Sequence, residues 1–239
     1  AIDSSGNSSS KKFTLEVYEP KPSSGGTTTR ARTDFQTIVE THKAEHTKIG
    51  LDISKWQEDV DFSKVKKAGA EFIMIRVGTR QGKNGEIVLD PKFEQNIKGA
   101  LQEGLEVGVY FYSYASSMKD AKQEAEWVLK QIKDYDVTLP VVFDWEEWQR
   151  FNQYHLSFYG LTQVAETFLS TVEKAGYEGM LYSSKTYLEN MWFPTDYDIW
   201  LAHYTKKTNY QGKYRMWQLC NNGKIDGISG DVDIDVLYY

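Results

Sequence analysis

The chain has 239 residues, a formal net charge of −6 and a single cysteine, Cys220. Its composition fits one globular α/β domain, and the negative charge argues against nucleic acid as a partner, because phosphate binding needs a basic surface. One cysteine excludes an intrachain disulfide and a four-thiolate zinc site. No apolar run reaches the roughly 18 residues that a transmembrane helix needs.

The first 47 residues differ in composition and in hydrophobic pattern from the rest of the chain. Two Ser/Gly-rich stretches, typical of flexible linkers, surround residues 13–18, where apolar and polar side chains alternate as in a short strand. An amphipathic helix is possible from Asp34 to His46. We therefore expect residues 1–47 to form an N-terminal tail or linker, and residues 48–239 to form one catalytic domain.

Two patterns raise the question of a metal site. His42 and His46 fit the motif H-x-x-E-H, and on a helix they would share a face. A catalytic zinc also needs a third ligand and a dry pocket, which this polar segment does not offer, so we expect a solvated helix. Asp226, Asp231 and Asp235 resemble a calcium-binding cluster, but no loop has the ligand spacing. We expect no metal and no cofactor.

From Ile49 onward, strand-like and helix-like segments alternate. Alternation of this kind predicts a mainly parallel sheet, and eight strands in one domain of this size favour closure into a barrel. No Gly-x-Gly-x-x-Gly follows a strand, so a dinucleotide-binding fold has no support. The prediction is an α/β fold, a modified TIM-type barrel of the (β/α)5(β)3 kind. Strands are expected at 49–53, 71–77, 107–112, 141–146, 180–182, 199–202, 216–219 and 232–237, and helices at 62–68, 93–101, 121–132 and 158–172.

The strand at 141–146 ends in acidic residues. Side chains two apart on a strand share a face, so Asp144 and Glu146 are expected to point the same way and Glu147 the opposite way. Each of two neighbouring carboxyls raises the cost of ionising the other, which suits general acid chemistry. The alternative is an acidic strand end that is simply solvated.

A barrel would bring further polar side chains to the same mouth, because active groups gather at the carboxyl ends of the strands. This convergence favours a catalytic role for the acids over a solvated strand end. The strand ends carry Asp52, Arg76, Tyr110, Tyr112, Asp144, Glu146, Tyr182, His203, Tyr204, Gln218 and Asp233.

Six segments, in order, resemble the glycoside hydrolase family 25 lysozymes, or Chalaropsis-type muramidases. The resemblance runs from Ile49 to the C-terminus, and its motifs are weak singly but specific together. The segments are Gly50–Gln57, Val107–Tyr112, Phe143–Glu146, Ile199–Ala202, Trp217–Gln218 and Gly227–Asp233.

The resemblance implies hydrolysis of the β-1,4 bond between N-acetylmuramic acid and N-acetylglucosamine in peptidoglycan. Glu146 matches the family's general acid, and Asp144 matches the carboxylate that stabilises an oxazolinium-like species formed by the substrate's own N-acetyl group. Asp52 and Asp233 match two further acids of the cleft. These roles require a raised pKa at Glu146 and an ionised Asp144.

At the expected substrate contacts, the sequence departs from the family pattern. Many relatives carry Lys-x-Ser/Thr-Glu-Gly where this chain has Arg76–Arg80, so the glutamate is missing and two arginines change the charge there. Four tryptophans either bind sugar faces or belong to the hydrophobic core: Trp145, Trp148, Trp200 and Trp217. His203 either contacts the substrate or is a histidine near the mouth whose hydrogen bonds are made within the protein. The expected substrate-binding residues are Tyr110, Tyr112, Arg76, Tyr182, Trp200, His203 and Gln218.

Two other functions remain open. A chitinase-like hydrolase typically has a longer acidic strand motif, and Val142 stands where that motif needs an aspartate. A catalytically silent wall-binding module would keep the cleft without the chemistry, but all four acids are present. We expect a monomeric enzyme that is secreted or associated with the cell wall and binds peptidoglycan strands.

Overall fold

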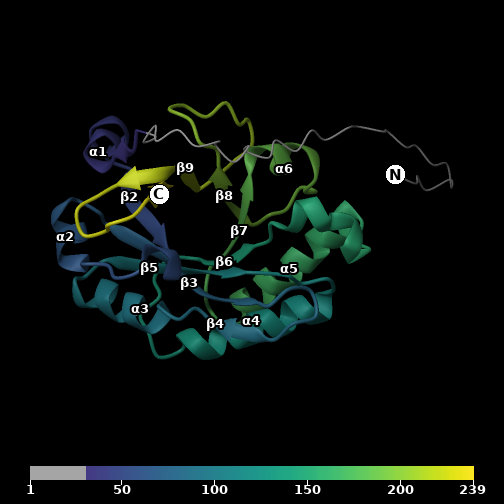
Figure 1. Ribbon diagram of the computed structural model, residues 1–239. Coiled ribbons are helices and arrows are strands. Elements are labelled where there is room, and N and C mark those ends of the chain that lie inside the picture. Colours follow the sequence, from purple (N-terminus) through teal and green to yellow (C-terminus); the bar gives the residue numbers. More distant parts are fainter. Residues whose placement is uncertain (1–30) are drawn as a thin grey trace, which may run out of the picture. The chain divides into compact units, whose positions relative to one another are not determined.

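Eight strands close into a barrel in the computed structural model, which describes residues 31–239 (Figure 1). The short strand expected at residues 13–18 lies outside the described residues. Each of the eight strands predicted from residue 49 onward is present, so the predicted barrel fold is confirmed. The barrel strands are β2 (Thr47–Ile53), β3 (Phe72–Arg80), β5 (Glu106–Tyr112), β6 (Val141–Asp144), β7 (Gly179–Ser184), β8 (Asp198–Ala202), β9 (Met216–Lys224) and β10 (Val232–Tyr238).

The barrel is parallel except at its last strand. Neighbouring strands from β2 to β9 run in the same direction, whereas β10 is antiparallel to both β9 and β2. The start of β10 therefore lies beside the end of β2, and Asp233 pairs with Asp52. This reversal brings an acid from the beginning of a strand to the mouth where the other strands end.

Helices cover the outside of the barrel mainly between the parallel strands (Figure 1). The four predicted helices are present; the sequence did not predict α6, β1, β4 or the two 3-10 turns, which are too short to show a periodic pattern. None of the described helices is both long enough and apolar enough to cross a membrane. The elements are β1 (Thr33–Asp34), α1 (Phe35–His42), η1 (Lys55–Gln57), α2 (Phe62–Lys67), β4 (Ile87–Leu89), α3 (Phe93–Gln102), α4 (Met118–Ile132), η2 (Glu147–Tyr154), α5 (Phe158–Lys174) and α6 (Lys185–Asn190).

The core has two layers, one inside the barrel and one between the strands and the helices. Strands that are buried on both faces need apolar side chains at successive positions, which explains the continuous apolar runs in the sequence. In α5, Leu161, Ala165, Phe168 and Val172 form the buried stripe that packs towards the strands. The interior layer is made by Phe72, Met74, Tyr110, Leu139, Val142, Met180, Tyr182, Trp200, Ala202, Met216 and Leu237.

Helix α1 ends earlier than the sequence predicted, so His42 and His46 do not share a helical face. The Thr47 hydroxyl donates to the carbonyl of His42 at 2.9 Å, and Lys43 is already extended. His42 instead packs edge-on against Trp217, with 5.4 Å between the ring centroids. Within residues 31–239, no group of three or more His, Cys, Asp or Glu side chains is arranged to hold a metal ion.

Helix α1 also packs onto the barrel, although it precedes the boundary proposed at residue 48. Asp34 caps the helix by accepting from the backbone N–H of Gln36, and β1 pairs with β9. Phe35 and Ile38 are buried in the same core as the barrel strands. We therefore expect α1 to contribute to the stability of the barrel.

Replacing Phe35 by alanine tests this contribution. Because the ring is 1% exposed, Phe35→Ala should lower the free energy of unfolding by about 3–5 kcal/mol, measured by urea denaturation. Phe193→Ala, which removes an exposed ring, is the matched control. Equal losses in the two variants would show that α1 contributes nothing particular to the barrel.

Candidate active site

A cavity of about 180 Å³ opens at the end of the barrel where the parallel strands finish. All four predicted acids line it, together with every predicted substrate-binding residue except His203. Four acids from β2, β6 and β10 and from the turn after β6 thus face one space. The lining residues are Asp52, Ser54, Trp56, Gln57, Arg76, Tyr110, Tyr112, Asp144, Glu146, Tyr182, Trp200, Gln218 and Asp233.

Asp144 and Glu146 are held by the end of β6. The strand ends at Asp144, two residues earlier than predicted, and Asp144 lies level with Tyr112 and Tyr182 on the neighbouring strands. The backbone N–H of Ser113 donates to the carbonyl of Asp144 at 2.7 Å. Glu146 is the residue directly before the η2 turn, and both carboxyl groups still reach the cavity.

The two carboxyls differ in exposure. Asp144 is 5% exposed, and burial raises its pKa well above the usual value, with help from the charges of Glu146 and Asp52 and against the opposing charge of Arg76. Glu146 contacts solvent at the mouth, but the surrounding cavity walls desolvate it and raise its pKa. Both groups therefore keep their protons to higher pH than the same acids do in an unfolded chain.

Gln218 joins the other two acids. Its amide nitrogen donates to Oδ2 of Asp52 at 2.8 Å and to Oδ2 of Asp233 at 3.1 Å. Its amide oxygen accepts from the hydroxyls of Tyr182 and Tyr204 at 2.8 and 3.0 Å. An amide has two donor and two acceptor positions, so all four are used within the protein. Gln218 thus holds two acids and two tyrosines in fixed positions.

Among the described residues that line the cavity, Arg76 alone is basic. Its guanidinium is bound by the buried carboxylate of Asp90, with Nε 2.8 Å and Nη2 2.7 Å from the same oxygen. Asp90 also accepts from the backbone N–H groups of Lys55 and Lys92. This anchoring keeps a positive charge close to Asp144, where it partly offsets the repulsion among the acids.

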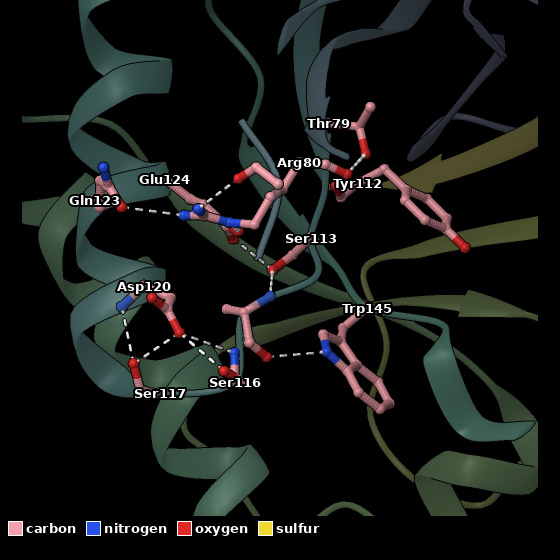
Figure 2. Close-up of polar contacts among 12 residues, drawn as sticks. Thr79, Arg80, Tyr112, Ser113, Ser116, Ser117, Asp120, Gln123, Glu124 and Trp145 are labelled. Carbon is pink, nitrogen blue, oxygen red and sulfur yellow. Dashed lines mark hydrogen bonds and ion pairs between the residues drawn. The ribbon is translucent and has the colours of Figure 1, made fainter. Parts of the chain in front are cut away.

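A buried polar network lies behind the ends of β5 and β6 (Figure 2). Arg80 donates to Glu124 on α4 at 2.7 Å, and Ser113 donates to the other oxygen of that carboxylate. Ser113 also accepts from the N–H of Ala115, whose carbonyl receives the indole N–H of Trp145. The network therefore fixes the residue between the two central acids.

The structure corrects one expectation from the sequence, the role of Arg80, and decides the open alternative for two tryptophans. Arg80 does not alter the charge of the rim, because it is 7% exposed and paired with Glu124. Trp145 is fully buried, and Trp217 lies against His42, so neither is a sugar platform. The sequence showed the arginine but could not show its partner on a distant helix.

A second pocket of about 490 Å³ continues on the other side of Glu146 and Tyr182, which line both spaces. His203 lines this second pocket, and its ring nitrogen Nδ1 lies 2.8 Å from the Thr208 hydroxyl. Burial lowers the pKa of His203, which favours a neutral ring. Trp148 also lines the pocket, stacked on Tyr187 at 4.2 Å between centroids.

Trp56 is a site residue that the sequence reasoning missed. It is 72% exposed, yet it lines the first cavity, in the 3-10 turn directly after the strand that carries Asp52. An exposed ring at a cavity mouth suits the apolar face of a sugar. Its position three residues after the end of β2 is the sequence feature that could have identified it as a site residue.

Breaking the Arg80–Glu124 pair should destabilise the fold. Arg80→Met leaves a buried carboxylate without its cation, and we expect a loss of about 3–5 kcal/mol in the free energy of unfolding. The double variant Arg80→Met/Glu124→Gln should recover part of that loss, because no buried charge remains. Urea denaturation of both variants measures this, and a double variant less stable than Arg80→Met would contradict the assignment.

The free energy of unfolding should fall as the pH rises. Burial and the charges of Asp52 and Glu146 raise the pKa of Asp233 to about 9, against about 3.9 in an unfolded chain. The native state then binds the proton more tightly, so this contribution is complete below about pH 4 and is lost as the pH rises through about 9. In Asp233→Asn, the free energy of unfolding measured by urea denaturation should decline less between pH 5 and 9. An unchanged slope would contradict this contribution of Asp233.

Known proteins share both the sequence pattern and the fold. The family described as "Glycosyl hydrolases family 25" matches residues 51–228. The protein named "Uncharacterized protein YegX" from Escherichia coli K12 is 30% identical over 199 residues, 81% of this chain and 71% of that protein. The "Autolytic lysozyme" of Clostridium acetobutylicum is 26% identical over 191 residues, 78% of this chain and 54% of that protein.

A solved structure agrees with these relatives. The modular autolysin LytC from Streptococcus pneumoniae, in complex with a synthetic peptidoglycan ligand, has a TM-score of 0.72 and 25% identity, over 82% of this chain and 48% of that chain. This chain thus spans about half the length of LytC. Because the family match covers most of the chain and the barrel is shared, the protein belongs to glycosyl hydrolases family 25 and is a glycoside hydrolase.

Proposed function

We propose that the protein is a lysozyme that cleaves the β-1,4 bond between N-acetylmuramic acid and N-acetylglucosamine in peptidoglycan. The observation that carries the proposal is the pair of Asp144 and Glu146 in one cavity with Asp52 and Asp233. The name of the Clostridium relative and the peptidoglycan ligand of LytC support the choice of substrate. The site of action is then the cell wall, reached by a secreted or wall-associated protein that works as a monomer.

Glu146 is the general acid and base of the proposed reaction. Its carboxyl donates a proton to the glycosidic oxygen while the carbonyl oxygen of the substrate's N-acetyl group attacks the anomeric carbon, which breaks the bond to the leaving sugar. The Glu146 carboxylate then takes a proton from the water that opens the oxazolinium ring. The raised pKa of Glu146 suits the first step, because the acid must hold its proton near neutral pH.

Asp144 stabilises the charge of the intermediate. Positive charge that develops on the N-acetyl group favours the ionised form of a neighbouring carboxylate, which opposes the effect of burial on the pKa of Asp144. The nearby guanidinium of Arg76 acts in the same direction. Because the substrate group attacks first and water second, the reaction retains the configuration at the anomeric carbon.

The two pockets suit the two sides of the scissile bond. Glu146 lines both, so the glycosidic oxygen belongs at their junction. The sugar that forms the intermediate then lies in the acid-lined cavity with Trp56 at its rim, and the leaving sugar lies in the larger pocket with Trp148. Aromatic rings in both pockets offer apolar surface to sugar faces.

The two alternative functions have less support. In a chitinase-like enzyme, an aspartate is expected two residues before Asp144, but Val142 occupies that position in the apolar interior. A silent wall-binding module would not need four acids in one cavity. Binding of peptidoglycan without release of reducing ends by the intact protein would favour the silent module.

Glu146→Gln should lower the release of reducing ends from purified peptidoglycan by at least about a hundredfold, the usual scale for loss of a general acid. The fold should remain, as circular dichroism would show. Glu126→Gln is the matched control, because Glu126 is an exposed glutamate on α4 that lines neither pocket. Near-normal turnover by Glu146→Gln would refute its role.

A further inference from the structure

Asp235 is a buried acid to which the proposed reaction gives no role. It lies on β10, two residues after Asp233, so both side chains point into the barrel. Asp235 is 0% exposed and lies outside the lining of the acid-lined cavity. Among the described residues, no lysine, arginine or histidine forms an ion pair with it. Burial of an ionised carboxylate under these conditions is costly.

The hydrogen bonds of Asp235 leave one oxygen for a shared proton. Its Oδ1 accepts from the indole N–H of Trp200 at 2.8 Å. Its Oδ2 is buried, and no N–H or hydroxyl group of the described chain donates to it. The available proton is therefore one that is carried by a neighbouring carboxyl group.

Asp52 is that neighbour. On the adjacent strand β2, Asp52 pairs with Asp233 and Gly50 pairs with Asp235, so Asp52 and Asp235 are diagonal neighbours on the inward face. Burial and the charge of Asp235 raise the pKa of Asp52, so Asp52 can carry a proton and donate it to the unpaired oxygen of Asp235 in a carboxyl–carboxyl hydrogen bond. Two carboxyls form such a bond only when one of them is protonated. Since Oδ2 of Asp52 accepts from Gln218, the pair is also tied to the Gln218 bridge.

We propose that Asp235 is a positioning residue for the hydrolysis: it accepts the proton of Asp52 in a shared hydrogen bond and thereby keeps Asp52 neutral at the cavity wall. The proposal rests on the proposed function. The single negative charge of the pair then lies on Asp235, outside the cavity lining, and not on Asp52 beside the catalytic acids. The fixed carboxyl of Asp52 also keeps one orientation towards the substrate.

The charge of Asp52 matters because several titratable groups face it. Ionisation of Asp52 raises the pKa of Asp144 and of Asp233, and the charge of Glu146 acts on Asp52 in turn. Arg76, which lines the same cavity, is already bound by Asp90. The groups that face the pair are Asp233 from β10, Asp144 and Glu146 from β6 and its turn, Arg76 from β3, Tyr110 from β5, Tyr182 from β7 and Tyr204 after β8.

Asp235→Asn tests the proposal with a side chain of the same shape. The new amide nitrogen donates to Asp52 and so favours its ionised form, while the amide oxygen still accepts from Trp200. The negative charge of the pair then lies on Asp52 in the cavity wall instead of on Asp235, and this should move both limbs of the pH profile of kcat/KM for peptidoglycan by about one unit to higher pH. Asp226→Asn, which removes an exposed carboxylate from the loop before β10, should leave the profile in place. An unshifted profile in Asp235→Asn, whatever its activity, would overturn the proposal.

A second measurement does not depend on activity or on folding of Asp235→Asn. Wild-type protein labelled with ¹³C at the aspartate carboxyls is titrated by NMR, with Asp52 assigned from the Asp52→Asn variant. The expected result is an Asp52 resonance that stays in the protonated position at pH 7. Titration of Asp52 near the ordinary value of about 4 would overturn the proposal. A wild-type protein that does not hydrolyse peptidoglycan would contradict the proposed function alone, because the NMR result does not depend on turnover.

Discussion

Repulsion among carboxyl groups that are buried together is the constraint on which this barrel mouth depends. Asp52, Asp144 and Asp235 are each less than 10% exposed, and Glu146 and Asp233 stand beside them. Burial and mutual repulsion both favour the protonated forms, which is the condition that a general acid needs. The structure limits the repulsion with one anchored cation, Arg76, and with neutral donors such as the Gln218 amide and the Trp200 indole.

The strand order makes this arrangement possible. Parallel strands bring Asp52 and Asp144 to one end of the barrel, and the antiparallel β10 adds Asp233 from its own beginning. On the outside, the network from Arg80 through Glu124 and Ser113 fixes the turn around Trp145. The positions of the acids therefore depend on the backbone pairing of the barrel strands and on the buried Arg80–Glu124 ion pair outside the barrel.

Much of the fold could be predicted because its signals are local. The apolar run before Asp144 and the helical stripe of α5 are continuous in sequence, and the spacing of Asp144 and Glu146 predicted that both face one space. The partners of Arg80 and Asp235 could not be predicted, because they come from distant elements. The first helix was expected to reach His46 but ends at His42, because the Thr47 hydroxyl binds the carbonyl of His42, a contact that periodicity does not reveal.

The central claim is that this acid-lined cavity hydrolyses the bond on the reducing side of N-acetylmuramic acid. Mass spectrometry of the fragments released from defined peptidoglycan, after reduction of their ends with borohydride, tests it most directly. The account predicts fragments that end in reduced N-acetylmuramic acid. Fragments that end in reduced N-acetylglucosamine would contradict it.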